Sequence, residues 1–367
     1  MSPFPYEPGL MKIHFPLMGF NLSGGVRVII NLANGLVNLG HEVRITVPAF
    51  RAEPPFPVDE RVEVVVLGKE TDSRVRYAAL LVKLAARWGD IIVATGFKTP
   101  YLIRLSIRTN ASAAITIYLV QSYEPTVQGV HFSKSLCRRF FHRQVALRSY
   151  TQTDHRFYVS RGIAFELGVD QDPIVVHPGV DINVFRPKSS RCIRPLPIGM
   201  ILSEDRLKGF PVFLEACNSL VDLQGTIDIL LLQGGPSCNG IPYQMKMRNT
   251  SNDCDLSDYY NELGVFVFPS LSEGFGLPPL EAMACGTPVI LTDCGGVSEY
   301  AVHEENCLMV PPGDPESLAS AIRRMVQSPD LREKLRKAGI ETARRFTWED
   351  TVSRFQEGLL KVVSATE

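Results

Sequence analysis

The residues best suited to chemistry lie between 269 and 286, in the sequence PSLSEGFGLPPLEAMACG. Glu273 follows an apolar run that predicts a buried strand, and Glu281 comes eight positions later. Between them, Gly274 and Gly276 have no Cβ atom to keep the backbone away from a ligand. Loops at the carboxyl ends of parallel strands form the ligand sites of open α/β proteins. The segment therefore predicts a pocket with two carboxylates and several backbone N–H donors.

The types of these residues indicate a ligand that has both hydroxyls and phosphates. Pro278 or Pro279 predicts the start of a helix that Gly286 ends, which places Glu281 in the first turn. A helix N-terminus favours phosphate, and carboxylates accept hydrogen bonds from hydroxyls. Together these features favour a nucleotide-sugar pocket. The alternative is structural, with Glu281 stabilising the helix dipole and Glu273 solvated in a loop.

Composition narrows the classes of protein to which the chain can belong. Its 367 residues are 45% hydrophobic and 21% charged, which predicts globular folding in about two domains. The 38 basic and 39 acidic residues argue against a nucleic-acid partner. Charge is polarised, with 20 basic and 14 acidic residues up to position 180 and 18 and 25 after it. This asymmetry favours unlike ligands for the two halves.

The cysteines and apolar runs predict a cytoplasmic protein without a metal. Eight cysteines form no CxxC pair and have no spacing that would make a metal site. The first residues lack the basic stretch and apolar core of a signal peptide. The longest apolar stretch, 111–120, is shorter than the ~20 residues that span a bilayer.

Apolar periodicity predicts two α/β domains in succession. The chain opens with a strand over 11–17, a loop to Gly25, a helix that Gly40 ends and a strand over 43–47, which is the crossover unit of doubly wound folds. A turn-rich stretch near 180 predicts a linker. Further strands are expected at 62–67, 90–95, 113–120, 156–160, 174–177, 198–202, 226–233, 265–269, 288–292 and 307–310, and helices at 210–220, 278–285 and 315–327. We therefore expect a first domain over 1–180, a second over 181–346 and a final helix over 347–367.

The segment EGFGLPPLEAMACGTPV, from Glu273 onward, closely resembles the signature of glycosyltransferase family 4, whose members are retaining enzymes of GT-B fold. Other stretches occur in the order that the family shows: 23–26 with 40–43, 177–181 with Phe185 and Pro187, and 295–299. The resemblance implies two Rossmann-like parallel-sheet domains facing across a cleft. It also implies a donor nucleotide held mainly by the second domain, and a final helix that crosses back to the first.

The resemblance assigns roles residue by residue. Glu273 would hold the donor sugar's hydroxyls, and Glu281 would hold the ribose of the nucleotide. Glycines 24 and 25 would close on the diphosphate from the first domain. Backbone N–H groups for the sugar and diphosphate would come from Gly274, Phe275, Gly276 and Leu277.

Of the two basic residues with which the family neutralises the diphosphate, this sequence matches one. Lys208 occupies the place of the family's lysine, whereas the arginine position falls at 202 or 203, where there is no arginine. Three interpretations stay open: Arg206 reaches the phosphates from a differently shaped loop, a basic residue of the first domain substitutes, or turnover is low. Lys208 also fits a plain surface lysine that leads into a helix.

The first domain carries a second departure from the family. Gln121 and Glu124 resemble a pair found in relatives that build surface polysaccharides, where they would face the acceptor or the donor sugar. The alternative is a solvated loop at the end of a strand. The run Asp253-Cys254-Asp255 resembles a metal-binding DxD, which we discount because it lies in a polar stretch, 248–257, with no neighbouring strand expected.

A basic segment, 133–150, permits two interpretations. Basic and apolar residues alternate at near-helical spacing, as in helices that lie on anionic membranes. The favoured alternative is a domain helix that packs Leu136, Phe140 and Leu147 inward and leaves a solvated basic face. The first interpretation would place the protein peripherally at the inner face of a membrane.

These observations predict a metal-independent retaining glycosyltransferase without a cofactor. It would move a hexosyl or deoxyhexosyl unit from a nucleotide diphosphate sugar to a carbohydrate or lipid-linked acceptor, in surface polysaccharide or glycoconjugate synthesis. The alternative is a non-catalytic GT-B scaffold that binds nucleotide sugar or a partner enzyme. A nicotinamide oxidoreductase is disfavoured because no GxGxxG follows the first strand.

Overall fold

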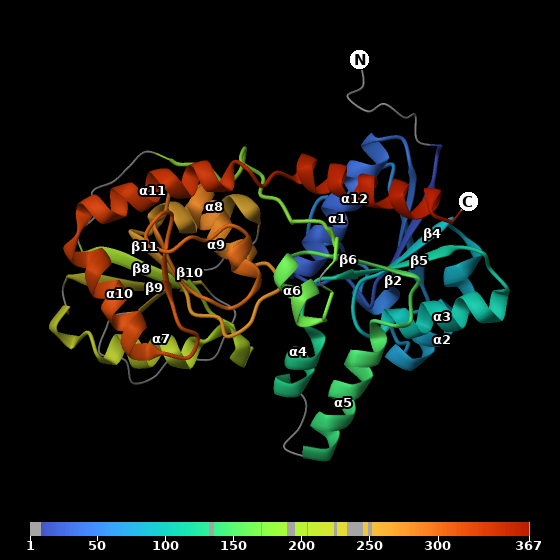
Figure 1. Ribbon diagram of the computed structural model, residues 1–367, viewed down its shortest axis with the longest axis horizontal. Coiled ribbons are helices and arrows are strands. Elements are labelled where there is room, and N and C mark those ends of the chain that lie inside the picture. Colours follow the sequence, from blue (N-terminus) through green and yellow to red (C-terminus); the bar gives the residue numbers. More distant parts are fainter. Residues whose placement is uncertain are drawn as a thin grey trace. The chain divides into compact units, whose positions relative to one another are not determined.

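The chain forms two compact units in the computed structural model (Figure 1), which describes residues 9–131, 136–169, 171–188, 195–203, 205–223, 226–232, 245–248 and 252–366. Unit 1 takes in the described residues up to Val159, then Ala164–His177 and those from Trp348 onward. Unit 2 comprises Ser160–Ile163 and Pro178–Thr347. The sequence placed the two boundaries after 180 and 346, whereas the structure has them after 177 and 347.

Unit 1 is built on a parallel sheet in which the first strand of the chain lies in the interior, beside the central strand β4. β4 is buried along its whole length, as expected for a strand covered on both faces. The order reverses between β1 and β4, which makes a topological switch point. In spatial order the strands are β3 (Glu63–Leu67), β2 (Glu42–Pro48), β1 (Lys12–Pro16), β4 (Ile91–Ala94), β5 (Ile115–Val120), β6 (His155–Tyr158) and β7 (Ile174–Val175).

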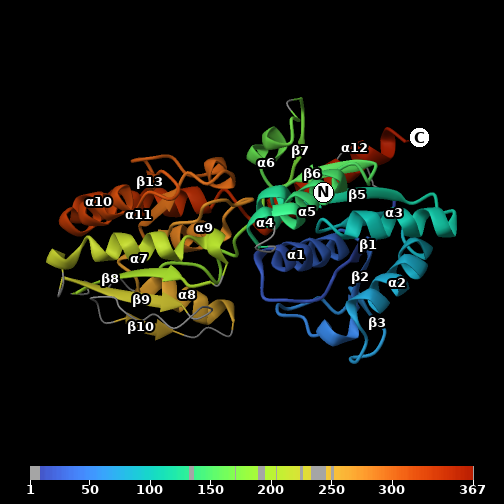
Figure 2. The same cartoon turned by 90° about the horizontal axis from the view of Figure 1, so that it is seen from below.

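The helices of unit 1 include the last one of the chain. Helix α12 packs against α1, where a Cβ on Gly35 would lie 2.2 Å from a Val352 methyl, and His41 hydrogen-bonds to Gln356 at 2.9 Å. Helices α2 and α3 lie side by side in both views (Figure 1, Figure 2). The helices are α1 (Gly24–Asn38), α2 (Arg74–Leu84), α3 (Thr99–Asn110), α4 (Glu124–His131), α5 (Leu136–Ser149) and α12 (Trp348–Ser364), while α6 (Arg161–Glu166) begins in unit 2 and ends in unit 1.

Unit 2 repeats this plan with a second parallel sheet. Its strand order reverses between β8 and β11, so the loops that follow these two strands flank the switch point. In spatial order the strands are β10 (Met245–Arg248), β9 (Ile227–Leu232), β8 (Leu196–Ile201), β11 (Val265–Phe268), β12 (Val289–Thr292) and β13 (Leu308–Val310). The helices are α7 (Phe210–Asn218), α8 (Asp253–Glu262), α9 (Leu277–Ala284), α10 (Pro315–Gln327) and α11 (Pro329–Ala343). The prediction of two parallel-sheet α/β domains is confirmed.

Three elements differ from the sequence expectation. The polar stretch 248–257 was expected to have no neighbouring strand, which is wrong because β10 ends at Arg248 and α8 begins at Asp253. β10 is a short strand at the sheet edge with alternating Met and basic residues, a pattern too brief to stand out. α11 was not predicted, although Ser328 caps its first turn by accepting a hydrogen bond from the backbone N–H of Leu331.

The basic helix α5 also differs from expectation. Phe140, predicted to pack inward, has 67% of its surface exposed, and Phe141 beside it has 64%. Ala146 and Ser149 are the buried residues near the end of the helix. Figure 1 shows α4 and α5 side by side, extending from the sheet of unit 1. Among the residues that the structure describes, no helix is long and apolar enough to cross a membrane.

Candidate functional site

Lys208 and Glu273 meet at the switch point of unit 2. Lys208 ends a 3-10 turn, Arg206–Lys208, in the loop after β8, and Glu273 lies in the loop after β11. The Nζ of Lys208 is 2.7 Å from Oε1 of Glu273. The carboxylate side chain is 12% exposed and that of the lysine 36% exposed. The sequence therefore placed both residues in one site, although it did not predict that they pair with each other.

The electrostatics of this pair keep the lysine charged. Burial alone would lower the pKa of Lys208, but the charge of Glu273 and the hydrogen bond to it outweigh burial, and the pKa is raised above its ordinary value. Asp205 and Cys294 add smaller effects in the same direction. The site thus holds a permanent cation directly beside a carboxylate.

Backbone contacts hold the lysine loop against the loop that bears the glutamate. Gly209 has a φ of +71°, and a Cβ at this position would lie 1.8 Å from the carbonyl oxygen of Pro269. Leu271 donates its backbone N–H to the carbonyl of Leu207 at 2.7 Å. Only glycine permits both the left-handed backbone and this approach, so Gly209 fixes where Lys208 stands.

A third loop, after β12, supports the glutamate from the other side. The backbone N–H of Glu273 donates to the backbone carbonyl of Cys294 at 2.9 Å, and the N–H of Gly296 donates to the carbonyl of Glu273 at 3.1 Å. A Cβ on Gly296 would lie 2.0 Å from the carbonyl oxygen of Gly274. This close approach explains Gly296, and a φ of +95° explains Gly295, without any contact to a ligand.

The four residues after Glu273 shape the start of α9. Gly276 has a φ of +84° and its carbonyl accepts a hydrogen bond from Tyr300 at 2.6 Å. Phe275 is buried, with its ring 5.4 Å from that of Tyr300 and 5.8 Å from that of Phe346. Leu277 is buried as well. The side chains at 275 and 277 therefore serve the core, and what this segment offers to a ligand is its backbone.

Glu281 lies in a different position from the one expected. α9 begins at Leu277, so Glu281 belongs to the second turn, and its interpretation as a first-turn acid that favours the helix dipole is wrong. Its side chain is buried, with 4% exposure. Oε2 accepts a hydrogen bond of 2.9 Å from the hydroxyl of Tyr260 on α8. Sequence analysis missed Tyr260, because no spacing rule says which aromatic residue of a distant helix reaches a given carboxylate.

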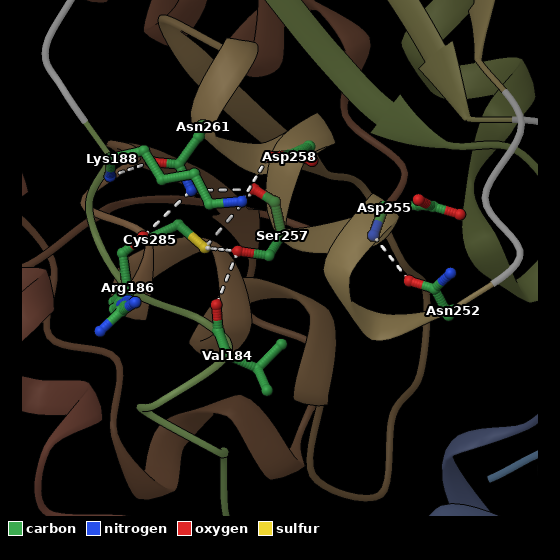
Figure 3. A network of polar contacts seen from close by, with 9 residues as sticks. All are labelled: Val184, Arg186, Lys188, Asn252, Asp255, Ser257, Asp258, Asn261 and Cys285. Atoms are coloured by element: carbon green, nitrogen blue, oxygen red, sulfur yellow. Dashed lines mark hydrogen bonds and ion pairs between the residues drawn. The ribbon is translucent and has the colours of Figure 1, made fainter.

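Helix α8, which bears Tyr260, is fixed to its surroundings by polar contacts (Figure 3). The hydroxyl of Ser257 donates to the carbonyl of Val184 at 2.8 Å and lies 3.6 Å from the sulfur of Cys285, the C-cap of α9. Asn261 accepts the backbone N–H of Lys188 at 2.7 Å. Asn252 begins the helix by capping the N–H of Asp255.

The discounted metal motif lies at the start of this helix. Asp253 and Asp255 occupy the first turn of α8, where carboxylates favour the helix dipole. Among the described residues no group of three or more His, Cys, Asp or Glu is placed to hold a metal ion.

The side chain of Arg206 is more exposed to solvent than those of Lys208 and Glu273. It is exposed, whereas Leu207 beside it is buried. Leu202, one of the two positions where the family places an arginine, is buried in the core of unit 2. The exposure of Arg206 disfavours the interpretation in which it reaches the phosphates.

The residues predicted in unit 1 gather at the carboxyl edge of its own sheet. Gly24 and Gly25 open α1, which Ser23 caps by accepting the backbone N–H of Val26 at 3.3 Å. A Cβ on Gly25 would lie 3.1 Å from the side-chain oxygen of Gln121, so the glycine loop and Gln121 are neighbours.

Glu124, predicted beside Gln121, begins α4. Its backbone N–H donates to the hydroxyl of Tyr150 at 2.9 Å, and Ser122 lies 3.4 Å from its Oε1. These local contacts hold Glu124 at the strand end but do not by themselves select an acceptor role over a structural one.

Comparison with known proteins matches two successive models to this chain. A glycosyl transferase 4-like domain matches residues 23–179, and a glycosyl transferases group 1 domain matches residues 239–342. The chain belongs to the GT4-type glycosyltransferases. The resemblance drawn from the motifs around Glu273 is thereby confirmed.

Individual relatives agree with this family. D-inositol 3-phosphate glycosyltransferase from Corynebacterium urealyticum is 30% identical over 210 residues, which is 50% of this chain and 50% of that protein. That from Acidothermus cellulolyticus is 32% identical over 223 residues, 53% of this chain and 48% of that protein. The chain thus matches about half the length of these curated relatives.

Solved structures share the fold over almost the whole chain. Sucrose-phosphate synthase from Thermosynechococcus elongatus has a TM-score of 0.79 at 21% identity and covers 96% of this chain and 99% of its own. The Anabaena protein HepE in complex with UDP-glucose has a TM-score of 0.74 at 17% identity, with 96% and 100% covered. The GT-B fold expected from the sequence is confirmed.

Proposed function

We propose that this protein is a metal-independent retaining glycosyltransferase that moves a hexosyl or deoxyhexosyl unit from a nucleotide diphosphate sugar to an acceptor hydroxyl. The observation that carries the proposal is the Lys208–Glu273 pair, with Nζ and Oε1 2.7 Å apart at the switch point of unit 2. One neighbour of the same fold, HepE, was solved both with UDP-glucose and with UDP and glucose, which agrees with this ligand class.

The chemistry follows from what each group can stabilise. Breaking the glycosidic bond of the donor places negative charge on the leaving diphosphate, and a charged Lys208 in a preorganised position stabilises that charge. Glu273 accepts hydrogen bonds from the sugar's hydroxyls and thereby orients the ring. The proposed step uses no covalent nucleophile. The acceptor oxygen bonds to the anomeric carbon on the face from which the diphosphate leaves and passes its proton to the departing diphosphate oxygen, so the anomeric configuration is retained.

The same proposal gives roles to the remaining predicted residues. Backbone N–H groups of the segment 274–277 bind sugar and diphosphate, and Glu281 binds the ribose. Gly24 and Gly25 approach the diphosphate from unit 1, where Gln121 and Glu124 face the sugar or the acceptor. No cofactor or metal takes part, and the product belongs to surface polysaccharide or glycoconjugate synthesis in the cytoplasm.

The test is incubation of the purified protein with UDP, GDP, dTDP and ADP sugars and a panel of carbohydrate and lipid-linked acceptors. Nucleoside diphosphate release is measured with and without EDTA, and NMR of the product gives the anomeric configuration. Release that survives EDTA with retention is the expected result. Binding of a donor without release under any condition would instead support the non-catalytic scaffold, and failure to bind any donor would refute both.

We further propose that α5 rests on an anionic membrane surface, which suits a lipid-linked acceptor. Phe140 and Phe141 are exposed side by side on this helix, together with Arg143 and Arg148. Exposed rings among basic residues fit the boundary of an anionic bilayer. Co-sedimentation with phosphatidylglycerol vesicles but not phosphatidylcholine vesicles, lost in Phe140→Ser/Phe141→Ser, is expected. Equal sedimentation of the wild type with both vesicles would contradict it.

A further inference from the structure

Glu281 is a buried carboxylate that accepts a hydrogen bond from a buried tyrosine hydroxyl. With 4% of its surface exposed, the carboxylate has lost most of its hydration, and such a group requires hydrogen bonds to remain ionised. The hydroxyl of Tyr260 donates to Oε2 at 2.9 Å. A hydrogen bond to a charged acceptor is about twice as strong as one between neutral groups.

Tyr260 can act only as a donor in this contact. Its ring is completely buried. Burial, followed by the charge of Glu281, raises the pKa of Tyr260 well above its ordinary value, so the hydroxyl keeps its proton. A phenol that cannot ionise holds its proton permanently toward the carboxylate.

The position of Tyr260 is fixed from several sides. Its ring centroid lies 5.2 Å from that of Phe266 in an edge-to-face arrangement and 6.2 Å from that of Phe185. Its backbone carbonyl accepts a hydrogen bond from Thr287 at 2.7 Å. α8 itself is tied to the cap of α9 through Ser257 (Figure 3). The hydroxyl therefore cannot follow the carboxylate if the carboxylate moves.

We infer that Tyr260 is a positioning residue for nucleotide binding, which fixes one oxygen of Glu281 so that the carboxylate can accept hydrogen bonds from the ribose hydroxyls of a nucleoside diphosphate. This inference rests on the proposed function, in which Glu281 binds ribose. Tyr260 touches no ligand and acts through Glu281. It extends the nucleotide site to a helix, α8, that the sequence motifs do not include.

The chain contains a matched control beside Tyr260. Tyr259 lies on the same helix, is equally buried, and donates its hydroxyl at 2.9 Å to the backbone carbonyl of Met200 on β8. Tyr259→Phe and Tyr260→Phe each remove one buried hydroxyl and keep the ring. Only Tyr260→Phe alters the surroundings of Glu281, so a general loss of stability affects both variants and a loss of positioning affects one.

The experiment measures affinity for UDP, GDP, dTDP and ADP by calorimetry. For the nucleotide that the wild type binds best, Tyr260→Phe is expected to weaken affinity about tenfold at pH 7.5, while Tyr259→Phe stays within about twofold. In turnover, KM for the donor should rise in Tyr260→Phe with kcat little changed.

A double variant covers the case in which Tyr260→Phe fails to fold. Glu281→Gln removes the buried carboxylate on which Tyr260 is proposed to act. Adding Tyr260→Phe to Glu281→Gln should therefore weaken affinity by no more than about twofold relative to Glu281→Gln alone. A further tenfold loss in the double variant would overturn the inference, as would equal affinities and equal donor KM values for Tyr260→Phe and Tyr259→Phe. If the wild type binds none of the four nucleotides, the proposed function fails as well, whereas binding that ignores Tyr260 refutes the positioning role alone.

Discussion

Replacing Lys208 by alanine removes the ammonium that stands 2.7 Å from Glu273 and, in the proposed mechanism, beside the departing diphosphate. Charge on the diphosphate grows as the glycosidic bond breaks, so the cation stabilises the transition state more than the bound donor. We therefore expect the loss to appear in kcat, while the affinity for a nucleoside diphosphate changes less.

The magnitude follows from the surroundings of the ammonium. Loss of one preorganised charge-stabilising group costs about 100- to 1,000-fold in kcat. The lower end applies here because the side chain is 36% exposed, so water replaces part of the lost interaction, and because one of its protons is held by Glu273. We expect a decrease of about 100-fold, which corresponds to about 2.7 kcal/mol of transition-state stabilisation.

The assay is single-turnover release of nucleoside diphosphate from the best donor, with Arg206→Ala as the matched control. Arg206 is a basic residue of the same 3-10 turn but is exposed, so its removal should change kcat by no more than about twofold. Full activity in Lys208→Ala would show that the loop does not serve the diphosphate. Severe and less than additive losses in both variants would show that Arg206 bends toward the ligand and acts with Lys208 as a unit.

Three further predictions concern the sugar contact of the site, the glycine that supports it and the stability of unit 1. Glu273→Gln should lower transfer by about 100-fold while calorimetric affinity for the nucleoside diphosphate stays within about threefold, and an equal loss of affinity would place Glu273 on the nucleotide instead. Gly209→Ala should abolish nucleotide binding or folding, because the new Cβ would lie 1.8 Å from the carbonyl oxygen of Pro269. In the control Gly168→Ala the backbone also has a positive φ, +70°, but the Cβ would meet no atom within 4 Å. That variant should lower the free energy of unfolding in urea by only about 1–2 kcal/mol. Burial lowers the pKa of His14 from 6.5 to about 4. As the pH falls, the histidine of the unfolded chain therefore binds a proton before that of the folded chain. The free energy of unfolding should decrease by about 3 kcal/mol between pH 6.5 and 4. Tryptophan fluorescence can follow that unfolding since both tryptophans lie in unit 1, and a drop of the same size in His14→Asn would refute the assignment to His14.

The sequence predicts the two sheets well because their strands are buried on both faces. β4, β11 and β12 are short, continuous apolar runs bounded by polar loops, and the sequence expectation for each falls within a residue or two of the observed strand. β10 is not predicted from the sequence because it has only four residues, two of them basic. It owes its strand conformation to pairing with β9 rather than to its own composition.

Of the site, the sequence predicts only which residues follow strands that are neighbours in the sheet. Lys208 and Glu273 each follow a strand next to the switch point, so their shared edge of the sheet can be read from the sequence. Their mutual ion pair cannot, because it depends on a left-handed glycine and on backbone bonds between two loops. The contact of Tyr260 with Glu281 joins two helices across the core, and local periodicity carries no information about such a pair.

The pairing of Lys208 with Glu273 gives a physical reason for the order in which the proposed site would work. Before the donor binds, each charge is the partner of the other, so neither an unpaired carboxylate nor a lone ammonium has to be stabilised in a site where the carboxylate is 12% exposed. When the donor enters, its sugar hydroxyls offer protons to Glu273 and its diphosphate offers oxygens to Lys208, so each group exchanges part of one partner for another without moving far. Because the backbone bonds from the β8, β11 and β12 loops hold both residues in place, little reorganisation is left for the moment at which the glycosidic bond breaks. On this reasoning the glycines that bring the loops together contribute to turnover as much as the charged side chains that they position.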